Sequence, residues 1–196
     1  MLTVMLASPH EAPGYASPGD PSGQSRVLVT GIKNRSFPAT DILLEGDGHH
    51  YLNAGFAGSL HPDWKAGTVF LAETVVGETG DVLETSPVFN RLILRTFHSQ
   101  RVSCRIGRLL TVSVPVEDAL LREELRHRFQ ADAVDMEAHG LLTQLKNSIH
   151  PVSVVKIISD QADEQAEGDY RENTERLSRR LGMLLTFIRK GLDTVS

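Results

Sequence analysis

Short apolar runs bounded by turn-forming residues divide the first half of the chain. Residues 2–7 form one such run, which is too short for an ordinary helix and has the length of a buried strand. Residues 8–25 contain four prolines together with glycine and serine, and this composition predicts a loop. Further strands are predicted over residues 26–30, 50–53 and 68–76. The small residues over 53–58 predict a turn after the third strand.

Helical spacing becomes plainer in the second half. A short helix is predicted over residues 39–45 in the first half. Further helices are predicted over 88–98, 117–128, 136–146 and 170–190, and strands over 102–112 and 152–158. The terminal helix carries one apolar stripe, made by Leu177, Leu181, Leu184 and Ile188. Strands that alternate with helices predict an α/β fold, in which helices cover both faces of a sheet.

Composition and charge remove several classes of function. With 40% hydrophobic and 23% charged residues, a chain of 196 residues can bury a core, and its length predicts a single domain over 1–196. The net charge of −5 and the absence of a basic cluster argue against a nucleic-acid partner. No apolar run approaches the length of a membrane span, and the first residues lack a signal-peptide pattern, so we expect no membrane association and a cytoplasmic protein. Cys104 is the only cysteine, which fits a reducing compartment and predicts a small core residue.

The common cofactor and metal motifs are missing. The sequence contains no Walker A loop, no complete G-x-G-x-x-G and no H-E-x-x-H. The adjacent histidines His49 and His50 have no partners at metal-ligand spacing, so no metal site is predicted. Candidate chemistry therefore rests on acidic side chains.

Three acids lie where a predicted strand ends or a predicted helix begins. Glu11 comes after the first strand, Glu137 lies in V-D-M-E-A, and Asp160 ends I-I-S-D. Ligands of α/β proteins gather beyond the carboxyl ends of the strands, so these three carboxyl groups are candidates for one cleft. Each also has an ordinary structural explanation, as a loop carboxylate, a charge in the first helical turn, or a cap.

Four stretches, taken in order, carry a resemblance to a known superfamily. They are residues 2–11, residues 27–32 (V-L-V-T-G-I), residues 53–60 (N-A-G-F-A-G-S-L), and the pair V-D-M-E-A and V-K-I-I-S-D-Q-A-D over 134–138 and 155–163. The chain resembles the nucleoside phosphorylase and nucleosidase superfamily, which includes 5′-methylthioadenosine/S-adenosylhomocysteine nucleosidase, futalosine hydrolase and purine nucleoside phosphorylase. The final pair of motifs is the most specific part of the likeness.

The resemblance implies a fold and an activity. The fold would be a three-layer α/β/α sandwich around a mixed central sheet, with an N-terminal half shortened between Glu11 and Arg26. The activity would be cleavage of the N-glycosidic bond of a purine nucleoside, in a homodimer or a higher homo-oligomer and without a metal or organic cofactor. Water would be the nucleophile in a nucleosidase, and inorganic phosphate would be a co-substrate in a phosphorylase.

The resemblance also assigns roles to the acids and their neighbours. Asp160 matches the general acid at purine N7, Glu137 the acceptor of hydrogen bonds from the ribose hydroxyls, and Glu11 the base that activates water. Met136 matches a residue that packs on the sugar. Ser159 matches the residue that orients the acid.

The remaining pocket residues follow from the same likeness. Ala54, Gly55 and Phe56 would form a pocket wall, with the glycine permitting close approach to the ligand. The aromatic side chain that stacks on the base would be Phe56 or Phe129.

Two alternatives to hydrolysis stay open. Relatives have a second glycine where this chain has Lys33, in the turn that starts at Gly31. Lys33 and Arg35 could supply positive charge for a phosphate, which would make the protein a phosphorylase. Loss of turnover would instead leave a nucleoside-binding module, although the presence of all three acids argues against that reading.

Overall fold

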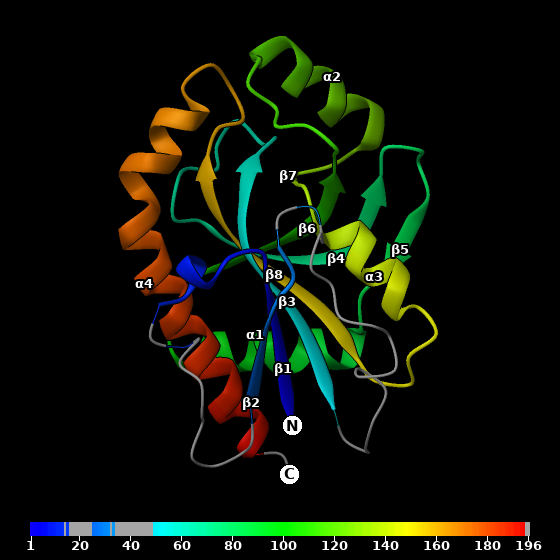
Figure 1. Ribbon diagram of the computed structural model, residues 1–196, viewed down its shortest axis with the longest axis vertical. Coiled ribbons are helices and arrows are strands. Elements are labelled where there is room, and N and C mark those ends of the chain that lie inside the picture. The colour runs from blue at the N-terminus through cyan, green and yellow to red at the C-terminus, as the bar shows by residue number, and fades with distance from the viewer. Residues whose placement is uncertain (14, 16–24, 32, 34–48, 195–196) are drawn as a thin grey trace.

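The computed structural model describes residues 1–13, 15, 25–31, 33 and 49–194, and shows a strongly twisted sheet covered by helices (Figure 1). The strands are β1 (Leu2–Leu6), β2 (Ser25–Val29), β3 (His50–Ser59), β4 (Val69–Gly77), β5 (Val82–Glu84), β6 (Cys104–Thr111), β7 (Ala133–Asp135) and β8 (Val152–Asp160). The helices are α1 (Pro87–Ser99), α2 (Ala119–Phe129), α3 (Ala138–Leu145) and α4 (Ala166–Asp193), and a short 3₁₀ turn, η1, covers Pro9–Glu11. The α/β fold class and the mixed sheet predicted from the sequence are confirmed.

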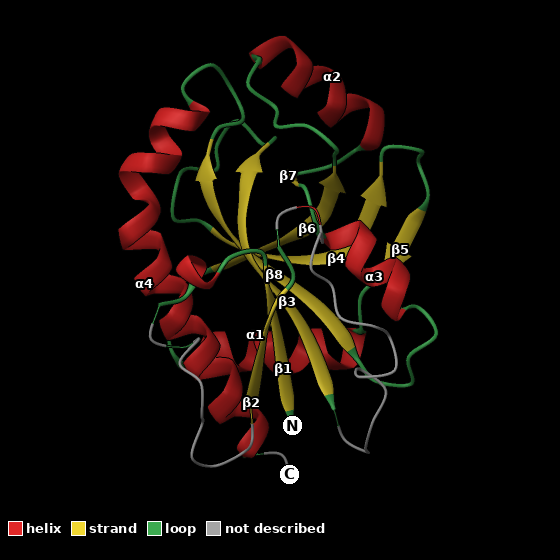
Figure 2. Cartoon of the chain, in the orientation of Figure 1, coloured by secondary structure: helices red, strands yellow, loops and turns green. Residues whose placement is uncertain are grey.

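The sheet closes on itself through its last strand. Its main path runs β2-β1-β3-β7-β6-β4-β5, and β8 pairs with both β3 and β4. The pairing of β8 with β3 is parallel, whereas its pairing with β4 is antiparallel. The strands β3, β8, β4, β6 and β7 therefore form a ring, with β1 and β2 extending it at one side and β5 at the other (Figure 2).

Alternating side chains of β8 face two separate cores. Val155 and Ile157 belong to the core that also contains buried side chains of α1 and α4. Val154 and Ile158 belong to the core on the side of α3. The apolar stripe of α4 predicted from the sequence is buried, so helices cover both faces of the sheet as expected.

One sequence-based prediction was wrong, and two others lie outside the described residues. The third strand does not end at Asn53, because residues 53–58, predicted to form a turn, continue β3 to Ser59 in register with β8. The predicted helix over 39–45 and most of the proline-rich loop belong to the undescribed part of the chain. Among the described helices, none is long and apolar enough to cross a membrane.

Candidate active site

A cavity of about 360 Å³ opens where β1, β3, β7 and β8 end. That volume lies within the range of small-molecule sites. Glu11, Glu137 and Asp160 all line it, although 126 positions separate the first from the second in sequence and the strands β1, β7 and β8 do not pair with one another. The sheet therefore brings together the three acids that the sequence singled out.

Local hydrogen bonds hold Glu11 against the cavity. Ser8 and Glu11 form a capping box around η1, in which the backbone N–H of Ser8 donates to Oε2 of Glu11 at 3.1 Å. Pro9 occupies the first position of the turn, where its missing N–H costs nothing. Glu11 is only 9% exposed, and this burial raises the pKa of its carboxyl, with a smaller contribution from Glu137.

The absence of a side chain at Gly55 leaves space for the carboxyl group of Glu11. A Cβ atom at residue 55 would lie 2.8 Å from Oε1 of Glu11, and Gly55 has φ of 156°. We expect Gly55→Ala to displace the Glu11 carboxyl and to reduce kcat by more than about tenfold, while the fold persists. Steady-state kinetics on the variant test this, and Gly168→Ala, where a Cβ has open space, is the matched control. Equal rates for both variants would contradict the prediction.

Glu137 is the N-cap residue of α3, and its side chain does not cap that helix. Its Oε1 instead accepts a hydrogen bond of 3.3 Å from the backbone N–H of Lys33, a residue whose φ is 56°. Burial raises the pKa of the Glu137 carboxyl, and the neighbouring carboxylate of Asp135 raises it further. Lys33 thus contacts the site through its backbone.

Asp160 ends β8 with both carboxyl oxygens engaged. Oδ1 accepts the backbone N–H of Ala162 at 2.9 Å, and Oδ2 accepts the hydroxyl of Ser159 at 2.5 Å. Burial raises the pKa of Asp160 despite these two bonds. Gly58 leaves space for this arrangement, since a Cβ there would lie 3.0 Å from Oδ1. A carboxyl with a raised pKa that faces a cavity suits proton donation.

Lys156 is a site residue that the sequence-based interpretation missed. Its side chain is 2% exposed, and its Nζ atom lies 2.8 Å from Oδ2 of Asp135. Burial opposes its charge, but the carboxylates of Asp135, Glu137 and Glu11 outweigh burial, so the net pKa of Lys156 is raised and the group stays charged. In return Lys156 lowers the pKa of Glu11 and of Glu137. A lone lysine inside the apolar run of β8 was the available signal.

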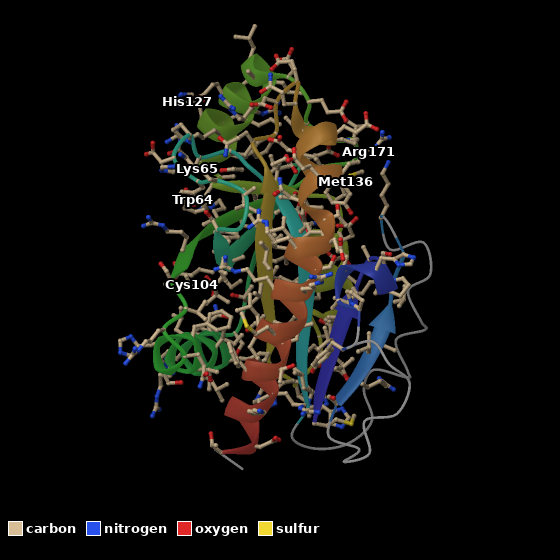
Figure 3. All side chains as sticks on the ribbon, turned by 90° about the vertical axis from the view of Figure 1, so that its left-hand side faces the viewer. Trp64, Lys65, Cys104, His127, Met136 and Arg171 are labelled. Carbon is tan, nitrogen blue, oxygen red and sulfur yellow. The ribbon has the colours of Figure 1, made fainter. Side chains whose placement is uncertain are left out.

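Met136, Phe56 and Tyr170 give the cavity an apolar wall. The rings of Phe56 and Tyr170 meet edge to face, with centroids 6.0 Å apart. Tyr170 comes from α4, which runs alongside β8 (Figure 3). The sequence-based interpretation placed Tyr170 at the start of the terminal helix and gave it no role. In the structure α4 begins four residues earlier, at Ala166.

Several residues predicted for the site do not line the cavity. Ala54 is 1% exposed in the core beneath α4, and Gly55 contacts Glu11 from behind. Phe129 is the last residue of α2 and packs against a core cluster that contains Ala131, with the Arg128 guanidinium 5.0 Å from its ring centroid. Gly31 has φ of 74° and is not part of the lining, and Arg35 lies outside the described residues.

Acidic groups dominate the charge of the cavity. Six carboxyl residues line it, namely Glu11, Glu117, Asp135, Glu137, Asp160 and Glu167, and no basic side chain of the described residues does. Lys156 lies behind this surface, paired with Asp135. No group of three potential metal ligands occurs within the described part of the chain.

Comparison with solved structures identifies the architecture. Futalosine hydrolase of Helicobacter pylori strain 26695 superposes with a TM-score of 0.84 at 22% identity, over 96% of this chain and 97% of that one. A mutant 5′-methylthioadenosine/S-adenosylhomocysteine nucleosidase of Helicobacter pylori, with 5′-methylthioadenosine in its active site, gives 0.84 at 20% identity over 96% and 97%. The S. pneumoniae nucleosidase with the transition-state inhibitor MT-ImmA gives 0.84 at 20% identity over 98% and 99%.

Comparison at the sequence level gives the family. No curated protein sequence matches the chain significantly. The profile of the phosphorylase superfamily matches residues 22–189, a range that contains Glu137, Lys156 and Asp160 and begins after Glu11. This match covers most of the 196 residues, and the fold agrees with it. The chain belongs to the phosphorylase superfamily.

Proposed function

We propose that the protein hydrolyses the N-glycosidic bond of a purine nucleoside, with 5′-methylthioadenosine and its relatives as the leading substrate class. The fold is that of solved nucleosidases, one of which holds 5′-methylthioadenosine in its active site. The observation that carries the proposal is the meeting of Glu11, Glu137 and Asp160 on one cavity with a largely apolar wall.

The proposed reaction divides its proton transfers between two ends of the site. As the C1′–N9 bond breaks, its electron pair moves into the purine, and Asp160 gives its proton to N7. The sugar gains positive charge, and Glu137 accepts hydrogen bonds from the ribose hydroxyls that strengthen as this charge develops. A water molecule attacks C1′ and loses a proton to Glu11. The products are the free purine and the free sugar.

The charge of the cavity favours water over phosphate as the nucleophile. A carboxylate beside the attack site repels a phosphate dianion and activates water. A phosphorylase needs basic side chains or clustered backbone donors at that position. In the turn that starts at Gly31, the structure describes one backbone donor in contact with an acid. This donor is the N–H of Lys33, which bonds to Glu137.

The test is product analysis across a panel of nucleosides. The full chain is incubated with 5′-methylthioadenosine, S-adenosylhomocysteine, futalosine, inosine and adenosine, each with and without inorganic phosphate, and the products are separated by chromatography. We expect purine release at the same rate in both conditions, accompanied by the free sugar. A sugar 1-phosphate formed only with phosphate would replace hydrolysis by phosphorolysis. Binding of these nucleosides without any release would indicate a binding module.

A further inference from the structure

A second cavity, of about 320 Å³, shares no lining residue with the first. It lies where the loop before β4 and the start of β6 meet α4. In the view of Figure 3, Lys65 and Cys104 lie on one side of the upper part of α4 and Met136, from the first cavity, on the other. We call this second cavity, with Lys65, Thr68, Ser103, Arg105 and Arg180, the basic hollow.

Basic side chains from three separate segments converge on the basic hollow. Lys65, Arg105 and Arg180 line it. The Nη1 atoms of Arg176 and Arg180 come within 3.5 and 3.6 Å of the point that a Cβ of Gly67 would occupy, so both guanidinium groups face the same glycine. Because Lys65, Arg105 and the arginines of α4 lie far apart in sequence, they come together only when the chain folds.

The charges of the hollow have no acidic partners in the described part of the chain. Among the ion pairs of those residues, none involves Lys65, Arg105, Arg176 or Arg180. Within the described residues, the side chain of Arg176 donates one hydrogen bond, to the amide oxygen of Asn173 at 2.7 Å. The neighbouring Arg179, by contrast, pairs with Glu175 one helical turn away. Like charges held close together repel, and a bound anion would relieve that repulsion.

The backbone of the hollow is anchored to the sheet. The N–H of Gly67 donates to the carbonyl of Ile158 at 2.7 Å, and the N–H of Ile158 donates to the carbonyl of Thr68 at 2.8 Å. The side-chain amide of Gln161 donates to the carbonyl of Trp64, at the start of the same loop. The loop that carries Lys65 and Thr68 is therefore fixed before any ligand arrives, which lowers the entropy cost of binding.

Two hydroxyl groups complete the set of donors. Thr68 and Ser103 line the hollow beside the three basic residues. Phosphate oxygens bind to guanidinium, ammonium and hydroxyl groups, and the guanidinium group of arginine can bind them in a bidentate geometry. The grouping of these donors around one cavity differs from the extended basic stripe that follows a nucleic-acid backbone.

We propose that the basic hollow binds the phosphate group of a small phosphomonoester. Arg105 and Arg180 hold the phosphate oxygens, Lys65 supplies a further positive charge, and Thr68 and Ser103 donate hydrogen bonds. The volume of about 320 Å³ leaves space for an organic group beyond the phosphate. The inference is independent of the hydrolysis proposed above, since no residue of the hollow belongs to the acidic cavity.

Calorimetric titration of the full chain at low ionic strength tests the proposal, with inorganic phosphate and glycerol 3-phosphate as separate probes. We expect one site per chain for either probe, and tighter binding of glycerol 3-phosphate if the organic group is also held. The double variant R105Q/R180Q should weaken binding by at least about tenfold, because it removes two charge-assisted contacts. The control R179Q, on the same helix and paired outside the hollow, should bind within about twofold of the unaltered chain.

Three results would overturn the proposal. One is the absence of binding by both probes at millimolar concentration. Another is unchanged binding by R105Q/R180Q, which would show that the anion binds at another site, such as the first cavity. The last is tight binding of a single-stranded oligonucleotide without binding of either small probe, which would make the hollow part of a nucleic-acid surface.

Discussion

Asp160→Asn is expected to reduce turnover strongly while leaving nucleoside binding nearly intact. An amide has the shape of the carboxyl but no proton to transfer, so the departing purine would leave as an anion. General acid catalysis contributes roughly 10²- to 10⁴-fold, and we expect kcat to fall by that factor. Dissociation constants for 5′-methylthioadenosine, measured by equilibrium binding with the inactive variant, should stay within about threefold of the substrate affinity of the unaltered chain.

The pH dependence gives this prediction a second readout. Because burial raises the pKa of Asp160, the carboxyl keeps its proton at a pH where an exposed aspartate has lost it. Activity should fall as pH rises through that pKa, and the residual activity of Asp160→Asn should lack this fall. Asp63→Asn, the same exchange at an exposed loop position, is the control and should behave as the unaltered chain. An active Asp160→Asn enzyme would remove Asp160 from the role of acid.

Lys156→Met is expected to impair both the chemistry and the fold. The lysine lowers the pKa of Glu11, which burial alone would raise further. Without this cation Glu11 takes up a proton at higher pH, and a protonated Glu11 cannot accept one from water. The rising, acid side of the profile of kcat/KM against pH should therefore move to higher pH. Breaking a buried ion pair also leaves Asp135 uncompensated, which costs about 3–5 kcal/mol in the free energy of unfolding.

A second substitution separates catalysis from folding. Lys156→Arg keeps the positive charge next to Asp135, so its pH profile should keep the original position even if its packing reduces stability. Chemical denaturation gives the stability of each variant, and kinetics are measured below the onset of unfolding. If Lys156→Met folds and its profile coincides with that of the unaltered chain, Lys156 has no part in controlling the charge of Glu11.

The three acids could be predicted because each lies where a strand ends or a helix begins, and ligands of α/β proteins bind beyond the carboxyl ends of the strands. The same rule does not predict that Glu11 is buried, because its burial depends on Gly55, which lies on a strand more than 40 residues away in sequence. Ala54 was predicted to line the pocket but is buried in the core. The small residues of β3 were interpreted as a turn, whereas they continue the strand and pair with β8.

Other features depend on contacts that no local pattern records. Lys156 looked like an interruption of an apolar run, and its importance appears only when Asp135 lies 2.8 Å away. Phe129 was a candidate for stacking on the base, but it does not line the cavity and packs instead against a core cluster that contains Ala131. The short strand β5 is too brief to leave a periodic signal.

The closure of the sheet by β8 has a consequence for the order in which the protein assembles. β8 comes late in the chain, yet it fills the gap between β3 and β4, which are complete about 75 residues earlier. During synthesis both of those strands therefore present open edges until Val152–Asp160 has emerged from the ribosome. Because β8 bonds on both sides, its amide hydrogens should be among the last to exchange with solvent once the ring has formed. The strand that carries Lys156 and Asp160 is thus also the one that completes the native sheet.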